Sequence, residues 1–521
     1  MEKGSSEGKI TGAASIVGAA TVVSRVLGYI RDAAVAYVFG AGLYADAFFM
    51  AFRIANLLRR LVGEGALTSS FIPIFTEEKN RRTTEGTRAL VSSVFTLFTL
   101  ILVALTLLGM VFSREIVLLM APGFAVDPEK FRTTVNLTWM IFPYMVFIGL
   151  MAIAMGVLNS YRHFTAPALS PVFFNLSIIA AVFAVAPFLA TPVYALAIGV
   201  LAGGFVQLAV QVPYLGRHGM VPKPLLNFKD PAIKKIFLLM GPAAFGVGIY
   251  QLNIFVTLWF SSQLPEGAVS YLYYAGRLME LPLGVFGVAV STAALPSLAE
   301  HAAKKEWDAF RDSLSFAVRI VNFVTIPATV GLFVLSYPII DLLFRRGEFG
   351  IGATNGTAIA LYYYTIGLVP VAISRILTSV FYSLKDTVTP VWVAFVSFIF
   401  NVILCFALVG PLGHGGLALA TSLSSIIGVI TLLVILRYRF GRFGGRMILS
   451  SSLKSTAASL VMGAVIYILI LKSGFGSLGV APRAVLICVS LAVGVAAYLT
   501  LSRLLKVPEL SFLKGILRKG R

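Results

Sequence analysis

The chain has 521 residues, of which 58% are hydrophobic and only 12% are charged. This balance excludes an ordinary soluble domain, and repeated runs of roughly 20 apolar residues indicate an all-α polytopic membrane protein. The formal net charge is +20, but the basic residues cluster in short connectors between apolar runs, so nucleic-acid binding is not expected. Cys405 and Cys488 each lie within an apolar run, and we interpret both as core residues without a disulfide or metal role.

Charged or Gly/Pro-rich breaks divide the apolar sequence into fourteen predicted transmembrane helices. In chain order the predicted spans are residues 10–39, 44–72, 89–112, 133–159, 167–190, 193–215, 236–260, 267–299, 314–344, 353–382, 388–411, 414–436, 450–471 and 484–505. The first nine residues are polar and the first span soon meets Arg25, so we expect no cleaved signal peptide.

Alternate connectors differ in their content of basic residues. The connectors on the side of the N-terminus, together with the two chain ends, carry 27 Lys and Arg residues, whereas the connectors on the other side carry 7. Basic connectors are retained in the cytoplasm during membrane insertion. The sequence therefore predicts that both termini are cytoplasmic.

Local sequence patterns recur at an offset of 223 or 224 residues. The matching pairs, each at the same place in its span, are Arg53 with Arg277, Pro73 with Pro296, Ser160 with Ser383, and Ala195 with Ala418. These pairs indicate that a unit of six helices occurs twice, and an even number of helices gives a parallel repeat whose halves enclose a central cavity. We predict an N-terminal lobe at 1–225, a C-terminal lobe at 226–446, and two further helices with a basic cytoplasmic tail at 447–521.

Five arginines interrupt the first two spans: Arg25, Arg31, Arg53, Arg59 and Arg60. An arginine at the centre of a bilayer costs about 2.5–3.5 kcal/mol even on lenient insertion scales, so five are costly unless they face a water-filled cavity. The nearby acids are Asp32, Asp46 and Glu64, which leaves the region net cationic. Surplus guanidinium groups suit a phosphate or another anion, because their planar fork pairs with such oxygens bidentately.

Helical periodicity gathers part of this charge into a stripe on the second span. At 100° per residue, Asp46, Arg60 and Glu64 fall within about 20° of Arg53, whereas Arg59 lies about 120° away. Such a polar stripe on an apolar helix is typical of a face turned towards protein or water.

Two further spans carry a smaller polar face. Arg25 and Asp32 share a face of the first span, and Ser270, Arg277 and Glu280 share a face of the eighth.

The alternative interpretation is that these charges form structural ion pairs between helices. It holds best where the counts of acid and base balance, as for Arg31 with Asp32 and for Arg277 with Glu280. We interpret two other arginines, Arg319 and Arg375, as structural residues that snorkel to the membrane interface.

Signals for catalysis are weak. All four histidines lie in or beside connectors, and the sequence contains no His-Glu-x-x-His motif. We therefore expect a protein that is not an enzyme and that has no cofactor or metal site.

Several motifs resemble the MurJ (MviN) family, which consists of lipid II flippases within the multidrug/oligosaccharidyl-lipid/polysaccharide (MOP) exporter superfamily. The motifs lie at residues 24–32, 45–49, 56–60, 63–66 and 273–280. The resemblance implies fourteen spans in two six-helix lobes plus two helices. It also implies transport of the lipid-linked peptidoglycan precursor from the inner to the outer leaflet of a bacterial plasma membrane.

The resemblance also implies which residues form the cavity. The family's important arginines fall on Arg25, Arg31, Arg59 and Arg277, with Asp46, Ser270 and Glu280 as polar partners. The stripe on the second span instead favours Arg53 and Arg60. We give Arg59 first place and keep the stripe as the second choice.

Two departures from the family pattern concern ion coupling. Gly276 replaces an acidic residue found in some members, and spans seven, eleven and twelve contain no Asp or Glu. A sodium site is therefore not expected, and the driving force stays open. The expected partners are lipid II, membrane lipid and cell-wall synthesis proteins, and we expect a monomer.

Three rival functions remain at this point. A cation-coupled multidrug exporter would share the fold, although it would favour carboxylates in the cavity. A flippase for a different polyprenyl-diphosphate-linked oligosaccharide and a non-transporting scaffold for cell-wall synthesis are the others.

Overall fold

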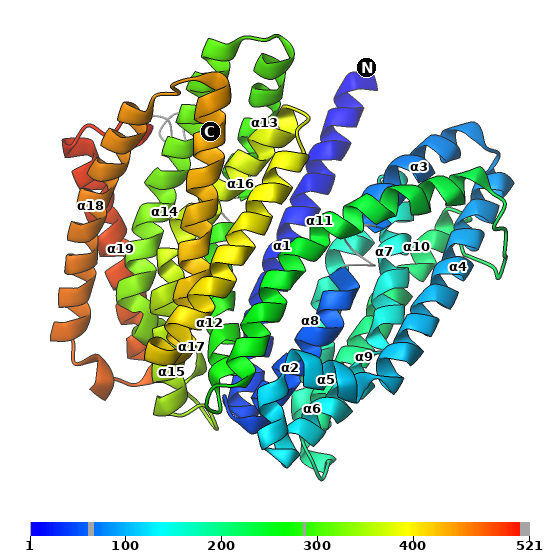
Figure 1. The fold of residues 1–521 in the computed structure, drawn as a ribbon, viewed down its shortest axis with the longest axis horizontal. Coiled ribbons are helices and arrows are strands. Elements are labelled where there is room, and N and C mark those ends of the chain that lie inside the picture. Colours follow the sequence, from blue (N-terminus) through cyan, green and yellow to red (C-terminus); the bar gives the residue numbers. More distant parts are fainter. Residues whose placement is uncertain (1, 61–66, 285–287, 511–521) are drawn as a thin grey trace. The chain divides into compact units, whose positions relative to one another are not determined.

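Figure 1 shows the computed structural model, which describes the backbone of residues 2–60, 67–284 and 288–510. Side chains are described over the same ranges except at 2–16, 58–59, 68–69, 242–247, 249–250 and 288–294. Within these ranges all regular secondary structure is helical. The predicted all-α class is therefore confirmed.

The chain divides into two compact units, one formed by 1–269 with 346–349 and the other by 270–345 with 350–521. The first unit contains α1 (Glu2–Phe39), α2 (Leu43–Arg59), α3 (Leu67–Arg81), α4 (Thr84–Val111), α5 (Ser113–Met120), η2 (Pro122–Val126), α6 (Pro128–Ile141), α7 (Tyr144–Ser160), α8 (Thr165–Ala184), η3 (Ala186–Phe188), α9 (Tyr194–Ala209), α10 (Val212–Arg217) and α11 (Pro231–Ser262). The second contains most of α12 (Ala268–Pro282), then α13 (Val288–Ala303), α14 (Trp307–Phe344), α15 (Ile351–Ile366), α16 (Leu368–Ser383), α17 (Val388–Phe440), α18 (Gly445–Lys472), η5 (Phe475–Ser477) and α19 (Val480–Leu504).

The predicted spans coincide with these helices, since each overlaps one helix or two consecutive helices. In the described part of the chain, eight helices are long and apolar enough to cross a membrane, or nine if the bent pair α15–α16 is one span. Several helices extend past the predicted span ends: α3 continues past residue 72 to Arg81, and α14 starts at Trp307, before residue 314. Gly413 breaks α17 with φ 56° and ψ −133°, at the predicted boundary between two spans.

The helix boundaries repeat at an offset of 223 residues. Corresponding helices start at Thr84 and Trp307, at Pro128 and Ile351, and at Thr165 and Val388, and others end at Ser160 and Ser383 and at Phe39 and Ser262. The turns after Ser160 and Ser383 also match, because Arg162 and Lys385 have positive φ angles of 58° and 59°. The backbone therefore reproduces the offset that the sequence patterns predict. The boundary between the two units lies after residue 269 and not at the predicted lobe boundary after residue 225. The reason is that α11, the counterpart of α1, packs against α3, α4, α5 and η2.

Three predicted basic connectors meet at one end of the first unit, here called its basic end. Lys79 Nζ donates to the Ser160 carbonyl oxygen at 2.6 Å, and Arg82 forms a bidentate pair with Asp230 at 2.6 and 2.8 Å. Lys235 Nζ lies 3.1 Å from Glu77 Oε2. The hydrogen bonds from Arg82 hold the pKa of Asp230 below its usual range.

The remaining connectors of the first unit meet at its other end, here called the opposite end. The hydrogen bonds that join them run from Tyr44 Oη to Glu129 Oε1 (3.0 Å), from Leu43 N to Glu266 Oε1 (2.6 Å), from Gly123 N to Ser262 Oγ (3.3 Å) and from Asn136 Nδ2 to Tyr194 Oη (3.0 Å). Connectors that the sequence assigned to opposite sides therefore meet at opposite ends of the first unit.

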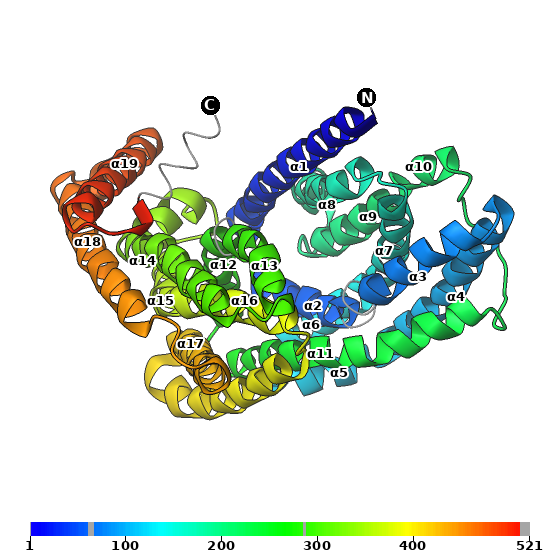
Figure 2. The same ribbon diagram turned by 90° about the horizontal axis from the view of Figure 1, so that it is seen from above.

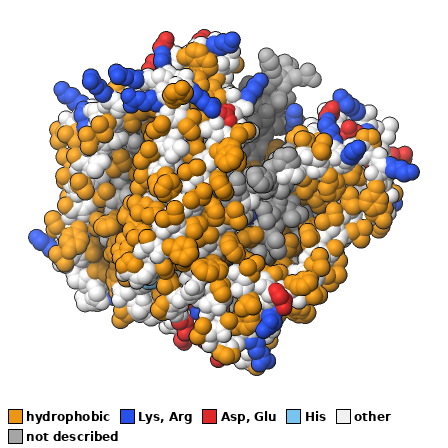
Figure 3. Space-filling view, in the orientation of Figure 1, with side chains coloured by type: hydrophobic (Ala, Val, Ile, Leu, Met, Phe, Trp, Pro, Cys, Tyr) orange, Lys and Arg blue, Asp and Glu red, His pale blue; other side chains and the backbone are white. Residues whose placement is uncertain are grey.

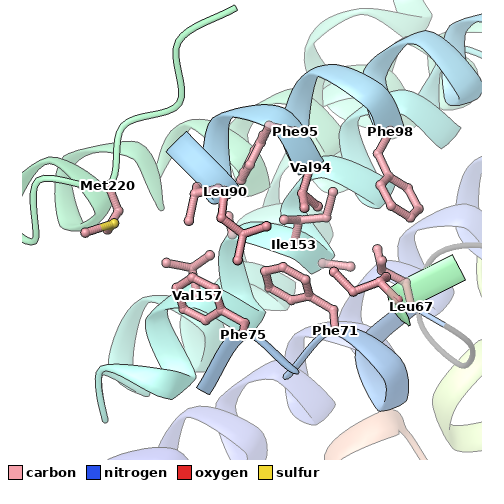
Figure 4. Packing of buried hydrophobic residues seen from close by; sticks show 14 of the residues in the cluster. Leu67, Phe71, Phe75, Leu90, Val94, Phe95, Phe98, Ile153, Val157 and Met220 are labelled. Atoms are coloured by element: carbon pink, nitrogen blue, oxygen red, sulfur yellow. The ribbon is translucent and has the colours of Figure 1, made fainter. Parts of the chain in front are cut away.

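An apolar core joins α3, α4 and α7 near the basic end (Figure 4). Phe71 and Phe75 of α3 stack with their ring centroids 5.2 Å apart and face Leu90 and Val94 of α4. Gly156 of α7 permits this approach, because a Cβ there would lie 2.9 Å from the Phe71 ring. These three helices therefore share one apolar core beside the connectors of the basic end.

In the second unit, α18 and α19 lie side by side and pack on α14 (Figures 1 and 2). Arg483 at the start of α19 donates to Asp341 of α14 at 2.7 Å, and Glu509 after α19 accepts from Arg319 of α14 at 2.6 Å. Buried ion pairs therefore fix this helical hairpin near both of its ends. In Figure 3, Lys and Arg gather at helix ends, and hydrophobic side chains cover the lengths between them.

Candidate functional site

The first predicted site residues lie on α1, which packs along α8. Arg31 donates to Asp32 Oδ1 through Nε at 3.0 Å and through Nη2 at 2.6 Å, and both residues are buried. Arg31 thus forms an ion pair with Asp32, as expected if these two charges are structural. Arg25 lies two turns earlier on an exposed stretch and forms no ion pair with any carboxylate in the described part of the chain.

Asp46, at the start of α2, is almost fully buried, with 1% of its surface exposed. One of its oxygens, Oδ2, accepts from Lys130 Nζ at 2.7 Å and from the Gly267 backbone nitrogen at 2.8 Å. Lys130 is itself 6% exposed and lies 4.3 Å from the centre of the Phe124 ring. Asp46 is therefore compensated by a lysine, because a buried carboxylate is tolerated only when it is paired and hydrogen-bonded.

Lys130 is a residue that the sequence analysis did not single out, since it counted only as one of the seven basic residues on the opposite connectors. It lies in the first turn of α6, which starts with Pro128 and is capped by Asp127, whose side chain accepts from the nitrogens of Glu129 and Lys130. An Asp followed by Pro is a signal for a helix start. That signal places Lys130 on a helix, although it does not identify Asp46 as its partner.

The polar stripe predicted on the second span is described only in part. Arg53, Asn56 and Arg60 are half-buried on α2 and at its end. The Asn56 side chain donates to the Phe52 carbonyl oxygen at 2.9 Å. The side chain of Arg59 and the whole of Glu64 lie outside the described residues, so the choice between Arg59 and the stripe stays a prediction.

The predicted site residues of the second unit lie on α12. Ser270 is fully buried, whereas the Arg277 and Glu280 side chains are 33% and 62% exposed and form an ion pair at 3.1 Å. Exposed pairs of this kind contribute at most about 1 kcal/mol. Nearby, Arg375 Nη1 donates to the Leu283 carbonyl oxygen at 3.2 Å.

Arg319 corrects another expectation. It was predicted to snorkel to the interface, yet its side chain is only 11% exposed, and it pairs with the buried carboxylate of Glu509. A guanidinium group that ends on a buried acid does not reach the lipid headgroups. Its structural role is nevertheless the one predicted.

The charges that the sequence singled out therefore fall into two groups. Arg31, Asp46 and Arg319 have close partners of opposite charge within their own unit, whereas Arg25 has none among the described carboxylates. Within the described residues, no group of His, Cys, Asp and Glu could hold a metal ion. The chemistry that these residues offer is the binding of anionic oxygens by guanidinium groups.

A family model described as "Lipid II flippase MurJ" matches residues 35–486 of the chain. The chain belongs to the MurJ family. A lipid II flippase MurJ from Burkholderia cenocepacia is 38% identical over 423 residues, covering 80% of this chain and 82% of that protein. A probable lipid II flippase MurJ from Vibrio cholerae is 35% identical over 505 residues, covering 94% and 95% of the two chains.

Solved structures agree with this membership of the MurJ family. A lipid II flippase MurJ in an inward closed conformation superposes with a TM-score of 0.78 at 30% identity, covering 94% of this chain and 98% of that one. An inward-facing multidrug resistance MATE family transporter of the MOP superfamily superposes with a TM-score of 0.67 at 14% identity, covering 80% and 94%. The second likeness shows the fold alone.

Proposed function

We propose that the protein is a lipid II flippase, which moves the lipid-linked peptidoglycan precursor from the inner to the outer leaflet of the bacterial plasma membrane. The observation that carries this proposal is membership of the MurJ family, whose model matches residues 35–486. A relative named as a probable lipid II flippase aligns over 94% of this chain and 95% of its own. Transport of this kind requires no catalytic group. A multi-pass helical protein of the inner membrane fits it.

The proposed architecture has fourteen transmembrane helices in two parallel six-helix lobes, at 1–225 and 226–446, followed by two further helices. The offset of 223 residues between corresponding helix boundaries supports the repeat. The concentration of 27 basic residues on one set of connectors supports cytoplasmic termini. Parallel repeats of this kind move a substrate by rocking about a central site, which gives alternating access.

The diphosphate of the substrate is proposed to bind the arginines Arg25, Arg31, Arg59 and Arg277, with Asp46, Ser270 and Glu280 as polar partners. Arg25 is the strongest candidate, because no described carboxylate neutralises it and an anion gains most from an uncompensated guanidinium. Arg277 follows, since its side chain is 33% exposed and its ion pair with Glu280 is an exposed one. A membrane potential that is negative inside favours outward movement of the anionic headgroup.

The test is an export assay with purified protein in vesicles that contain fluorescent lipid II. A membrane-impermeant quencher reports how fast the labelled headgroup crosses the bilayer. We expect Arg25→Ala and Arg277→Ala to reduce crossing to the rate of empty vesicles, because each removes a cation from the diphosphate. Arg446→Ala is the matched control, since Arg446 is an exposed arginine in the first turn of α18.

Two results would overturn different parts of this proposal. Crossing at the wild-type rate in both variants would show that these arginines do not hold the diphosphate. Wild-type protein that leaves labelled lipid II in place, yet transports a cationic drug, would instead favour the exporter of the same fold.

A further inference from the structure

A cavity of about 850 Å³ opens at the opposite end of the first unit and belongs to none of the predicted site residues. Three elements line it: the first turn of α2, the outward face of α6 and the start of α9. The lining side chains that matter here are Tyr44, Glu129, Arg132, Asn136, Trp139 and Tyr194. Aromatic rings, one acid and one base thus surround a single space.

The cavity carries both signs of charge on one helix. Glu129 and Arg132 are three residues apart in α6, so they lie on the same face, and both are exposed. Tyr44 Oη donates to Glu129 Oε1 at 3.0 Å, which orients the carboxylate and leaves its second oxygen available. Arg132 forms no ion pair with a described carboxylate. A ligand with a cation and an anion a few ångströms apart would complement this lining.

The length of the α6–α7 span indicates the depth of this cavity in the bilayer. The α6–α7 span runs over 33 residues from Pro128 to Ser160, which is about 50 Å of helix against a hydrocarbon core of roughly 30 Å. Ser160 lies at the basic end, so a core measured from there ends near Trp139, about 32 Å along the helix. Trp139 is 50% exposed, as is typical of tryptophan at the membrane interface. Glu129 and Arg132 then lie beyond the hydrocarbon, at the level of lipid headgroups.

We propose that this cavity binds the headgroup of a zwitterionic phospholipid with a primary ammonium group, phosphatidylethanolamine. Arg132 holds the phosphate, and the free oxygen of Glu129 accepts from the ammonium group. The Tyr194 hydroxyl, which accepts from Asn136 Nδ2 at 3.0 Å, retains its own proton to donate to a phosphate or ester oxygen. The acyl chains leave the cavity past Trp139 and Met140. On the proposed orientation, this lipid belongs to the outer leaflet.

Charge distinguishes this ligand from the other molecules available at the same depth. An anionic phospholipid would meet Glu129 without an ammonium group to satisfy the carboxylate. A neutral sugar offers hydroxyl groups to Glu129 and Arg132 but no charge opposite to either residue. The bound lipid would bridge α2, α6 and α9 and would stabilise the first unit, since any ligand that binds only the folded state does so.

The test measures lipids retained by the purified full-length protein, using native mass spectrometry and unfolding temperature in micelles doped with one lipid at a time. Wild-type protein is expected to retain phosphatidylethanolamine in preference to phosphatidylglycerol. Arg132→Ala should weaken retention about tenfold, because a charge-assisted hydrogen bond is lost. Glu129→Gln should remove the preference for the ammonium lipid. Arg114→Ala is the control, since Arg114 is exposed at the same end but lies over the Phe131 ring and outside the cavity.

Several outcomes would overturn this proposal. They are equal retention of both lipids by the wild type, unchanged retention in Arg132→Ala and Glu129→Gln, and displacement of the lipid by a soluble amino-sugar disaccharide. Unfolding temperatures measured without added lipid show whether each variant is folded. Because the readout is lipid retention, a failure of the proposed export activity would leave this result unaffected, and the reverse also holds.

Discussion

The charged residues around the last two helices differ in their pairing from Arg25 of α1. Around α18 and α19, Arg319 ends on Glu509, and Asp341 accepts from both Arg345 and Arg483. On α1, Arg25 has no partner among the described carboxylates. The comparison shows balanced ion pairs joining helices around α18 and α19, and the absence of such a pair at Arg25 within the described residues supports the proposal that this arginine holds a ligand.

The largest expected effect on stability comes from removing one partner of a buried ion pair around α18 and α19. Glu509→Gln leaves Arg319 buried without its carboxylate and weakens the contact from Ser451 Oγ, which lies 2.7 Å from Glu509 Oε2. We expect the free energy of unfolding to fall by about 3–5 kcal/mol, as when one partner of a buried pair is removed. Denaturant titration in micelles measures it. Asp308→Asn is the control, because the Asp308 side chain is 95% exposed in its pair with Arg311.

A double variant sharpens this first prediction. Replacing both partners, as Arg319→Met with Glu509→Leu, removes the uncompensated charge and restores apolar packing. Its stability should return to near the wild-type value. A double variant as unstable as Glu509→Gln alone would show that the pair does not explain how the hairpin is fixed.

The second expected effect is smaller and concerns the pair at the opposite end of the first unit. In Asp46→Asn, the amide oxygen still accepts from the Gly267 nitrogen, but Lys130 loses its counter-charge. We expect a loss of about 2–3 kcal/mol, measured in the same titration. Lys130→Met in the same chain should recover part of it. If Asp46→Asn abolishes export at full stability, Asp46 acts in transport as the proposed polar partner and not through its ion pair with Lys130.

The third effect is a dependence on pH at the basic end of the first unit. Burial, with smaller effects from His218 and Arg217, holds the pKa of His163 below its ordinary value of 6.5. The folded protein then binds fewer protons than the unfolded chain, so stability is complete above about pH 6.5 and falls as the pH drops below it. Unfolding temperatures between pH 7.5 and 5.5 measure this loss. His163→Phe keeps the stacking on Tyr214 and should reduce the dependence, and an unchanged dependence would assign it to another group.

The sequence predicted the helices and the repeat because both depend on local patterns. Apolar runs of about 20 residues locate the spans, and matched pairs such as Ser160 and Ser383 locate the repeat, which the helix boundaries reproduce. Helix ends beyond the membrane, as in α3, were missed because the prediction ended each span where its apolar run ended. The length of an apolar run indicates which residues cross the bilayer, and it does not indicate where the helix ends.

The partners of the charged residues were not predictable in the same way. Asp46 and Lys130 are 84 residues apart, and Arg319 and Glu509 are 190 apart, so no periodicity relates them. Only Arg31 with Asp32 and Arg277 with Glu280 were identified, because those partners are close in the sequence. Long-range ion pairs depend on tertiary packing, which a single sequence does not specify.

The smallest expected change in stability belongs to the residue with the largest expected effect on transport. Arg25 is exposed and has no described ion pair, so Arg25→Ala should change the free energy of unfolding by no more than about 0.5 kcal/mol, like other surface substitutions. Denaturant titration measures the stability of Arg25→Ala, and the export assay measures its transport of lipid II. A protein that is as stable as the wild type but does not export lipid II has lost a ligand contact rather than its fold. A large loss of stability in Arg25→Ala would show that this arginine is balanced after all, and the comparison between the two regions would fail.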